Sequence, residues 1–443
     1  MKTMEDKERL YAEHLSRLIQ VPTVSRREES QTDFAAFEQY HKTLEELYPL
    51  VHKHLTREII GKANLLYHWK GTSSDKAPVV LMSHQDVVPE GDWSKWKYPP
   101  FSGALEEGKV WGRGTVDCKS TMLVELEAVE ALLAEGFTPD FDVYLALGQD
   151  EEIMSARHGA GEIARHLESL GVKPGVVFDE GPGYSKKKDG SGATAAVVIG
   201  EKGYQDFEIY TEDKGGHACM PGATTGLGRL ARGIIAVEEN PMPYRLIPAV
   251  AQMFRAIAND RPEEQRAWFA DPEAHLEELK ELAKTDRMVD AQLRSTTAVT
   301  MACGSAQANI LPEYAYAIIN CRPMEGDTIE TMQAHFDAVL PADVKARFVD
   351  GGNPPRSSRT DTRAWQLIEE IGTELFGSVE MKPQMNAGGT DSRAYADMCD
   401  CVYRFNGLFE GEGWGPAHAV NECIPTEALP TGVHFMTEFL RRW

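Results

Sequence analysis

Acidic and histidine side chains follow several apolar runs of the sequence, at the point where each run ends. Carboxylate oxygens and imidazole nitrogens are the donors that hard and borderline metal ions accept. Because sites in α/β sheets gather at the carboxyl ends of the strands, these side chains are expected to meet there. The pattern therefore predicts a site for two metal ions, built from His84, Asp86, Asp117, Asp150, Glu151, Glu152, Asp179 and the distant His418.

Each of these residues has a more ordinary explanation when it is taken alone. A single histidine at a strand end is more often a hydrogen-bonding or core residue than a ligand. A single Asp before a helix is usually an N-cap, and adjacent Glu residues usually form a solvated face. The conjunction favours metal ions, because burying several carboxylates together without cations would cost a large free energy. For Asp150 both alternatives stay open: it orients its neighbours, or it caps the following turn.

The elements that must position these residues alternate along the chain. Apolar runs at 77–88, 141–148 and 174–181 predict strands, and helical spacing at 121–136 and 159–171 predicts the helices between them. Strands that alternate with helices require crossover connections. The expected fold class is therefore α/β, with a sheet flanked by helices.

Composition excludes several classes of partner. The chain has 443 residues, with 46 Lys and Arg against 69 Asp and Glu, which gives a net charge of -23. Nucleic acid and anionic membrane surfaces both require a basic face, so neither is an expected partner. No run approaches the roughly 18 apolar residues that a membrane helix needs. The 7 cysteines are odd in number and show no disulfide pattern, and the N-terminus lacks an apolar signal segment, so a cytoplasmic location is expected.

The ordered motifs resemble those of a known enzyme family. SHQDVVP, GRGTVDCKS, DEEIMS, FDEG, GGHACMPG and GPAHAVNE occur in the order of the aminoacylase, carboxypeptidase G and carboxypeptidase S family of co-catalytic zinc hydrolases. The resemblance covers the chain from Ile19 to His418, and the length is most similar to the carboxypeptidase S branch.

The resemblance implies a role for each residue of the site. His84 and Asp179 bind one metal ion, Glu152 and His418 bind the other, and Asp117 bridges the two. Glu151 is the general base, and Asp86 accepts the second N–H of the His84 imidazole. A cis peptide is expected between Asp117 and Cys118, whose thiol we interpret as a packed side chain. The expected cofactor is two Zn²⁺ per subunit, with Mn²⁺ or Co²⁺ as alternatives because the same ligands accept them.

The resemblance also implies a second domain. Residues 1–200 and 326–443 form the catalytic domain, and 201–325 form an inserted α+β lid that makes a homodimer, with a helical insertion at about 245–295. In the lid, His217 stabilises the oxyanion and Asn309 contacts substrate. Near the C-terminus, a GGTD loop with Gly388, Gly389 and Arg393 lies by the substrate's carboxylate, and an Arg can pair with a carboxylate through two hydrogen bonds.

The expected function is a metal-dependent hydrolase that cleaves an amide bond next to a free carboxylate, as a carboxypeptidase or dipeptidase does. The expected substrate is accordingly a peptide or an N-acyl amino acid. An N-acyl-amino-acid deacylase of the aminoacylase or desuccinylase type is the nearer alternative. A non-catalytic binding protein on the same scaffold is a remote one, because such a protein has little use for Glu151 beside a full ligand set.

Overall fold

The computed structural model describes residues 3–73, 75–153 and 159–443. The chain forms two compact units. Unit 1 comprises Met1–Ile199, Ser358–Pro383 and Thr390–Trp443, and unit 2 comprises Gly200–Ser357 and Gln384–Gly389. The chain therefore passes from unit 1 into unit 2 and back twice.

Unit 1 is built around a large mixed sheet with strand order β1-β2-β6-β3-β7-β17-β9-β16, and β8 pairs with β9. The centre is parallel, since β3 pairs in parallel with β6 and β7, and β7 with β17. The strands are β1 (Thr56–Ile60), β2 (Asn64–Trp69), β3 (Val79–His84), β6 (Val143–Gly148), β7 (Val176–Asp179), β8 (Tyr184–Lys186), β9 (Ala193–Glu201), β16 (Val379–Asn386) and β17 (Val402–Arg404).

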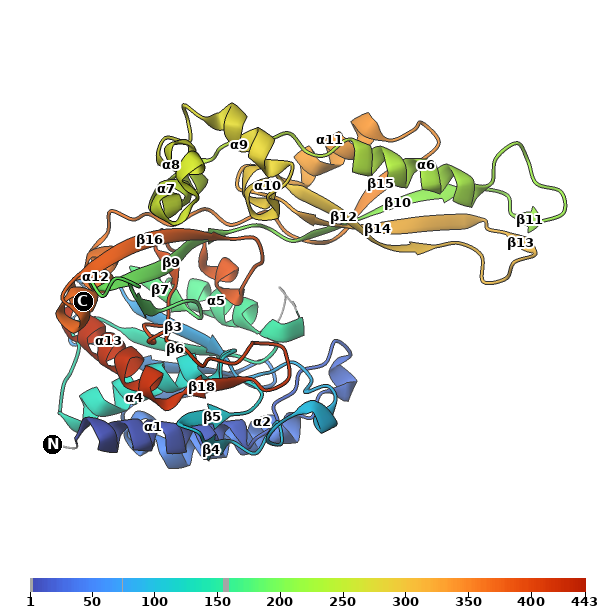
Figure 1. Cartoon of the computed structure of the whole chain (residues 1–443). Coiled ribbons are helices and arrows are strands. Elements are labelled where there is room, and N and C mark those ends of the chain that lie inside the picture. The colour runs from blue at the N-terminus through green and yellow to red at the C-terminus, as the bar shows by residue number, and fades with distance from the viewer. Residues whose placement is uncertain (1–2, 74, 154–158) are drawn as a thin grey trace. The chain divides into compact units, whose positions relative to one another are not determined.

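Helices flank this sheet (Figure 1). α4 packs on β3 and against α1, α3 and α13, whereas α5 packs on β2 and β6. The helices of unit 1 are α1 (Met4–Ile19), α2 (Phe34–Leu47), α3 (Pro49–His54), α4 (Lys119–Ala134), α5 (Ala160–Ser169), α12 (Arg363–Phe376) and α13 (Leu429–Arg442). The α/β fold class is confirmed, with each predicted strand and helix present.

The central strands are buried along their whole length. Every residue of β3, β6 and β7 is buried, which explains why these segments read as continuous apolar runs rather than alternating ones. A smaller antiparallel sheet of β4 (Ala104–Glu106), β5 (Lys109–Trp111) and β18 (Cys423–Pro425) joins the C-terminal part of the chain to the segment before α4.

Unit 2 contains an antiparallel sheet with strand order β12-β14-β10-β15, and α6 and α11 lie together on one face of it (Figure 1). The core between them includes Phe207, Ile319 and Phe336. The elements are β10 (Gln205–Glu212), α6 (Gly226–Glu239), β12 (Thr296–Cys303), β14 (Tyr314–Arg322), α11 (Ile329–Val339) and β15 (Lys345–Gly351). β11 (Gly216–His217) and β13 (Ile310–Leu311) form a separate short pair.

The predicted end of the lid at residue 325 is wrong. Unit 2 continues to Ser357, because β15 pairs antiparallel with β10 and α11 covers the same sheet. Gly388 and Gly389, which were placed in the catalytic domain, also belong to unit 2. This pairing joins segments more than 130 residues apart, such as Lys345 and Glu212, which local sequence patterns do not reveal.

The helical insertion lies between α6 and β12. It contains α7 (Pro248–Ile257), the 3₁₀ turn η4 (Ala258–Asp260), α8 (Glu263–Ala270), α9 (Leu276–Ala283) and α10 (Arg287–Leu293). Phe254 and Phe269 are fully buried and pack ring to ring, with centroids 4.9 Å apart. These aromatic residues therefore pack the insertion rather than lining a substrate site.

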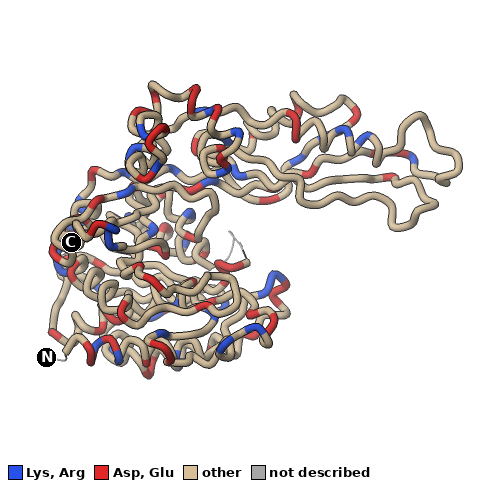
Figure 2. The backbone as a smooth tube through the Cα atoms, viewed as in Figure 1, with Lys and Arg blue, Asp and Glu red and all other residues tan. Residues whose placement is uncertain are grey.

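Acidic side chains are distributed over both units and interspersed with basic ones (Figure 2). This distribution agrees with the strongly negative net charge of -23. Among the described residues, no helix has both the length and the apolar character needed to cross a membrane.

Candidate metal centre

The predicted site residues come from neighbouring strand ends. His84 is the last residue of β3, the acids after β6 begin at Asp150, and Asp179 is the last residue of β7. Because β3 lies between β6 and β7 and runs parallel to both, the three carboxyl ends meet at one edge of the sheet. Glu151 and Glu152 start a short 3₁₀ turn there, Glu151–Ile153. The rest of the DEEIMS motif, from Met154, lies outside the described residues.

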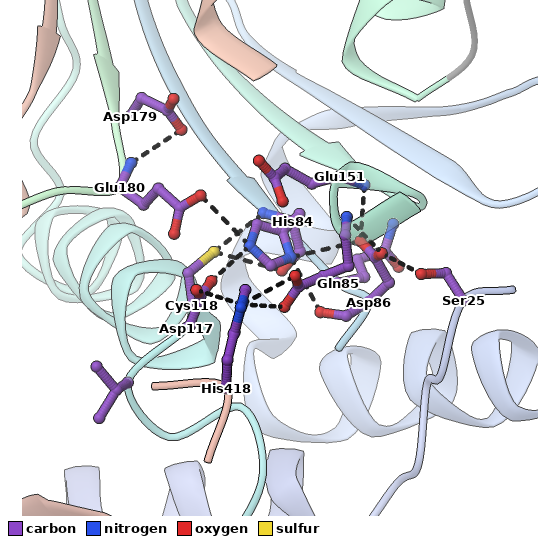
Figure 3. Close-up of polar contacts among 12 residues, drawn as sticks. Ser25, His84, Gln85, Asp86, Asp117, Cys118, Glu151, Asp179, Glu180 and His418 are labelled. Carbon is purple, nitrogen blue, oxygen red and sulfur yellow. Dashed lines mark hydrogen bonds and ion pairs between the residues drawn. The ribbon is translucent and has the colours of Figure 1, made fainter. Parts of the chain in front are cut away.

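Two groups of possible ligands share one residue. His84, Asp117 and Glu180, together with Cys118, form one group, and Asp117, Glu152 and His418 form the other. In each group, one ligand atom from every residue lies within 4.8 Å of the others. The Nε2 atom of His84 is 3.0 Å from Oδ1 of Asp117, and Nε2 of His418 is 3.0 Å from Oδ2 (Figure 3). The Asp117 carboxylate therefore lies between the two histidines, with one oxygen toward each.

Asp179, which was predicted as a ligand, is turned away from this cluster. Its Oδ1 accepts the backbone N–H of Glu180 at 2.8 Å, and its Oδ2 accepts that of Ser392 at 3.3 Å. Successive side chains of a strand point to opposite faces, so the next residue reaches the other side. Oε1 of Glu180 lies 3.5 Å from Nε2 of His84 (Figure 3). Glu180 therefore occupies the place that we assigned to Asp179.

Asp117 is held by a buried pair of charged residues that sequence reasoning missed. Oε1 of Glu422 accepts the backbone N–H of Val116 at 2.8 Å and that of Asp117 at 3.2 Å. Its other oxygen accepts from Arg113 at 2.6 Å, and both side chains are nearly inaccessible. Glu422 is the last residue of the GPAHAVNE motif, so this motif supplies both His418 and the support for Asp117.

The peptide between Asp117 and Cys118 is cis, as the resemblance implies. Cys118 is fully buried, and burial raises the pKa of its thiol well above the ordinary value. Its sulfur accepts the backbone N–H of His84 at 3.3 Å. A buried thiol in this state packs against the strand end and does not act as a nucleophile.

Asp86 connects His84 to the turn that carries Glu151 and Glu152. Its carboxylate is fully buried and accepts the backbone N–H groups of Glu151 and Glu152, each at 3.2 Å. Ser25, from the segment after α1, donates a third hydrogen bond at 2.5 Å (Figure 3). Nδ1 of His84 is closer to the backbone carbonyl of Asp86, at 2.9 Å, than to its carboxylate, at 3.4 Å. The expected orientation of the imidazole by Asp86 therefore comes mainly from its main chain.

Glu151 lies beside the cluster, and its side chain points toward His84 and Glu180 (Figure 3). Burial, followed by the negative charge of Glu180, raises the pKa of Glu151 well above the ordinary value. Burial and the charge of Asp117 likewise raise the pKa of Glu180. These carboxyl groups repel one another in a site of low solvent access, and divalent cations would remove that repulsion.

The histidine of the second group also has a raised pKa, but the cause is its hydrogen bonds to carboxylates rather than burial. Hydrogen bonds to Asp117 and Glu152 raise the pKa of His418 to about 10. His418 also has a backbone φ of 58°, in the left-handed region that few residues other than glycine adopt. The combination of imidazole nitrogen and carboxylate oxygen fits zinc, manganese or cobalt, so the residues present fit a pair of divalent ions.

Asp150 adjoins a second acid, Asp391 of the GGTD loop. A Cβ atom built on Gly159 would lie 2.0 Å from Oδ1 of Asp150 and 3.7 Å from Oδ2 of Asp391. Burial, together with the charge of Asp391, raises the pKa of Asp150 to about 8. Asp150 therefore lies close to Asp391, and the N-cap position of α5 is taken by Gly159.

Unit 2 brings His217 and Asn309 together. β11 pairs with β13 through His217 and Ile310, and the backbone N–H of Ala218 donates to the carbonyl of Asn309 at 3.0 Å. Both residues are exposed, at the end of unit 2 opposite the helical insertion (Figure 1). His217 and Asn309 therefore lie together on two exposed segments that pair through β11 and β13.

The GGTD loop follows β16. The backbone N–H of Gly388 donates to Oδ1 of Asn386 at 3.0 Å, which closes a tight turn before Gly389. Arg393 lies in the 3₁₀ turn Asp391–Tyr395 and is half-buried. Its guanidinium makes no hydrogen bond or ion pair with any residue that the structure describes.

Comparison with known proteins agrees with the motifs. The family model described as Peptidase family M20/M25/M40 matches residues 80–442. Probable carboxypeptidase S-like 2 of Dictyostelium discoideum is 31% identical over 97% of this chain and 84% of its own length. The N-fatty-acyl-amino acid synthase/hydrolase PM20D1 of Bos taurus is 32% identical, over 97% of this chain and 87% of its own.

A solved structure shares the fold. The M20 family metallo-carboxypeptidase Sso-CP2 of Sulfolobus solfataricus superimposes with a TM-score of 0.67 at 19% identity, covering 97% of this chain and 98% of that one. The predicted resemblance to the carboxypeptidase S branch is confirmed by the similarity of the Dictyostelium protein. This chain belongs to peptidase family M20/M25/M40 and is a hydrolytic enzyme of the metallopeptidase and amidohydrolase type.

Proposed function

We propose that this enzyme hydrolyses an amide bond next to a free carboxylate, with a peptide or an N-acyl amino acid as substrate. The observation that carries the proposal is the Asp117 carboxylate, which is shared by two ligand groups with Glu151 beside them (Figure 3). A carboxylate shared between two sites could hold both metal ions, and the free carboxylate beside them is available for proton transfer.

The residues that would hold the ions follow from the two groups. We assign His84 and Glu180 to one ion, Glu152 and His418 to the other, and Asp117 to both. We propose two Zn²⁺ per subunit, with Mn²⁺ and Co²⁺ as alternatives. When bound, the ions lower the pKa of the attacking water and polarise the substrate carbonyl.

Glu151 is the residue that moves the proton. Glu151 belongs to neither ligand group, so its carboxylate is free to take a proton from water during attack and to hold it until the leaving nitrogen accepts it. The hydrogen bonds that the backbone N–H groups of Glu151 and Glu152 donate to the Asp86 carboxylate fix the turn that carries both acids. One acid can therefore serve as a ligand while its neighbour stays free for proton transfer.

The substrate's carboxylate would bind at the GGTD loop. Arg393 offers a guanidinium with no protein ion pair among the described residues, and Gly389 offers a backbone N–H, since that of Gly388 already donates to Asn386. We assign His217 to the developing oxyanion and Asn309 to substrate contact, since the two lie together on the exposed loop pair of unit 2.

A second candidate function has specific support. The Bos taurus relative is named as an N-fatty-acyl-amino acid synthase/hydrolase, and it matches this chain as well as the carboxypeptidase S-like protein does. Deacylation of an N-acyl amino acid uses the same attack on an amide carbonyl next to a carboxylate. The two functions differ only in what lies on the acyl side of the bond.

We also propose a homodimer formed through unit 2. β12 is an edge strand of its sheet, and Met301 on β12 and Ile235 on the adjacent α6 are 59% and 51% exposed. Exposed strand edges with apolar side chains favour pairing with a second copy. Light scattering after size-exclusion chromatography should give the mass of a dimer, and Met301→Lys should shift it to that of a monomer.

We retain the cytoplasm as the proposed location. All 7 cysteines are free thiols, and Cys219 and Cys303 are exposed, which suits a reducing compartment. Fractionation of cells that express the tagged protein tests this proposal, and recovery outside the cytoplasm would contradict it.

The function is tested with purified, zinc-loaded enzyme and matched amide substrates. A panel of dipeptides and N-acyl amino acids, each as the free acid and as the C-terminal amide, is followed by mass spectrometry of the products. Cleavage of the free acids alone supports the carboxylate site, and the preferred members distinguish peptidase from deacylase. Equal cleavage of the amidated forms would contradict a site that recognises the carboxylate.

A further inference from the structure

The helical insertion of unit 2 is hydrogen-bonded to the strand that leads into the GGTD loop. Gln292, near the end of α10, is 6% exposed, and its side-chain amide donates to the backbone carbonyl of Met385 at 3.0 Å. The backbone N–H of Met385 approaches the sulfur of Met253, on α7, at 3.3 Å. The backbone N–H and the backbone carbonyl of Met385 are therefore both hydrogen-bonded by side chains of the insertion.

Lys202 attaches a third segment to the same place. Its backbone N–H donates to the carbonyl of Asn386 at 3.0 Å. Its ammonium group, on a side chain that is almost fully buried, donates to the carbonyls of Ala291 and Arg294, each at 2.9 Å. These are carbonyls at the C-terminal end of α10, where helices leave acceptors unpaired and favour a cation. The end of α10, the start of unit 2 and the end of β16 thus form one hydrogen-bonded cluster.

This cluster lies directly before the loop assigned to the substrate. Asn386 follows Met385, and its side chain accepts the N–H of Gly388 at 3.0 Å. A glycine pair has wide conformational freedom, so the direction of its amides depends on the residues that anchor it. Gln384–Gly389 group with unit 2, whereas the chain from Thr390 groups with unit 1. The insertion therefore anchors the first half of the loop.

We propose that the helical insertion positions the Gly388–Gly389 turn, and with it the Gly389 amide, for the substrate's carboxylate, and that Gln292 is the positioning residue through which it acts. This inference rests on the proposed function for the identity of the bound group. It gives the insertion, which packs its own aromatic core, a role in substrate recognition: it holds Met385 and Asn386 so that the turn at Gly388 has one orientation.

The test compares Gln292→Met with Gln265→Met in the full-length, metal-loaded enzyme. Methionine keeps the volume of glutamine but cannot donate to the Met385 carbonyl. Gln265 is the matched control, because it lies in the same insertion, on α8, and its amide oxygen accepts from Arg261 at 2.8 Å without touching β16. Hydrogen exchange of the peptides that cover 384–393 is measured without substrate, and KM and kcat are measured for each matched pair of free acid and amide.

We expect faster exchange over 384–393 in Gln292→Met alone. We also expect KM for free acids to rise about tenfold, the effect of losing roughly one hydrogen bond, while kcat changes less than KM. Wild-type exchange over 384–393 in Gln292→Met would overturn the proposal. So would an equal loss of activity in both variants with a matching fall in Tm, because that result indicates a general packing role.

The exchange measurement keeps this inference separate from the proposed function. If wild-type enzyme cleaves free acids and amides equally, the carboxylate assignment fails. Faster exchange in Gln292→Met would then still support the anchoring of the loop by the insertion, and unchanged exchange would overturn it.

Discussion

Nε2 of His418 lies 3.0 Å from Oε2 of Glu152, although 266 residues separate them in the sequence. The same imidazole nitrogen is 3.0 Å from Asp117, which the other ligand group shares. A loop that returns from near the C-terminus therefore completes the second metal group. That group depends on one exposed side chain, while the first is buried around His84.

Replacing His418 with Ala should remove one of two bound metal ions. We expect the metal content of purified protein, measured by inductively coupled plasma mass spectrometry, to fall from about two ions to about one per chain, with kcat reduced at least about a hundredfold. His275→Ala is the control, because His275 contacts Glu278 on the insertion. Two ions retained in His418→Ala would contradict this ligand assignment.

Metal binding should release protons at neutral pH. In the metal-free protein, Asp117 and Glu152 raise the pKa of His418 to about 10, so the imidazole is protonated at pH 7. A metal ion binds only the neutral imidazole, so the proton must leave and the apparent affinity should rise with pH up to about 10. Titration calorimetry in buffers of different ionisation enthalpy measures this release, and His418→Ala should release about one proton fewer.

The raised pKa of His418 also predicts how this residue affects the stability of the metal-free protein as the pH changes. The folded-state pKa of His418 lies above the ordinary value of 6.5, so the protonated ring stabilises the folded state. This contribution is fully present below pH 6.5 and is lost as the pH rises toward about 10. Thermal melts of metal-free protein should therefore show a wild-type advantage over His418→Ala at pH 6 that disappears near pH 10.

Glu180 and Asp179 should behave differently when each loses its charge. Glu180→Gln is expected to weaken binding of the ion held with His84, because Glu180 is the acid that faces that histidine. Asp179→Asn should keep both ions and cost about 1–2 kcal/mol of stability, because an amide replaces a carboxylate that accepts two backbone N–H groups. Metal analysis and chemical denaturation of the two variants decide between them, and loss of an ion from Asp179→Asn would restore the original assignment.

The choice between Asp179 and Glu180 could not be made from the sequence. The strand ends, the parallel order and the meeting of His84 with the acids after β6 follow from local periodicity and from the rule that sites gather at carboxyl ends. The choice between two adjacent acids depends on the residue at which β7 stops pairing. A shift of one residue turns a side chain to the opposite face, and no sequence pattern fixes that position.

Supporting residues were missed for a different reason. Ser25 reaches Asp86 across 61 residues, and Glu422 reaches Val116 across 306, so neither contact leaves a local trace in the sequence. Glu422 is the final residue of the GPAHAVNE motif, whereas Ser25 lies in none of the six motifs. The ligands could be named because their chemistry is unusual in a core, whereas ordinary hydrogen-bonding residues gain their role from tertiary contact.

Replacing Glu151 with Gln should separate catalysis from metal binding. Gln keeps the size of the side chain but can neither take a proton from water nor return it to the leaving nitrogen, so kcat should fall by about 10²–10⁴. Glu151 belongs to neither ligand group, so the metal content should stay at the wild-type value. Glu168→Gln, an exposed change on α5, is the control for surface charge. The measurements are turnover of the preferred free-acid substrate and metal content on the same preparation. Turnover within a few-fold of wild type would show that another group moves the proton, and loss of an ion would make Glu151 a ligand instead.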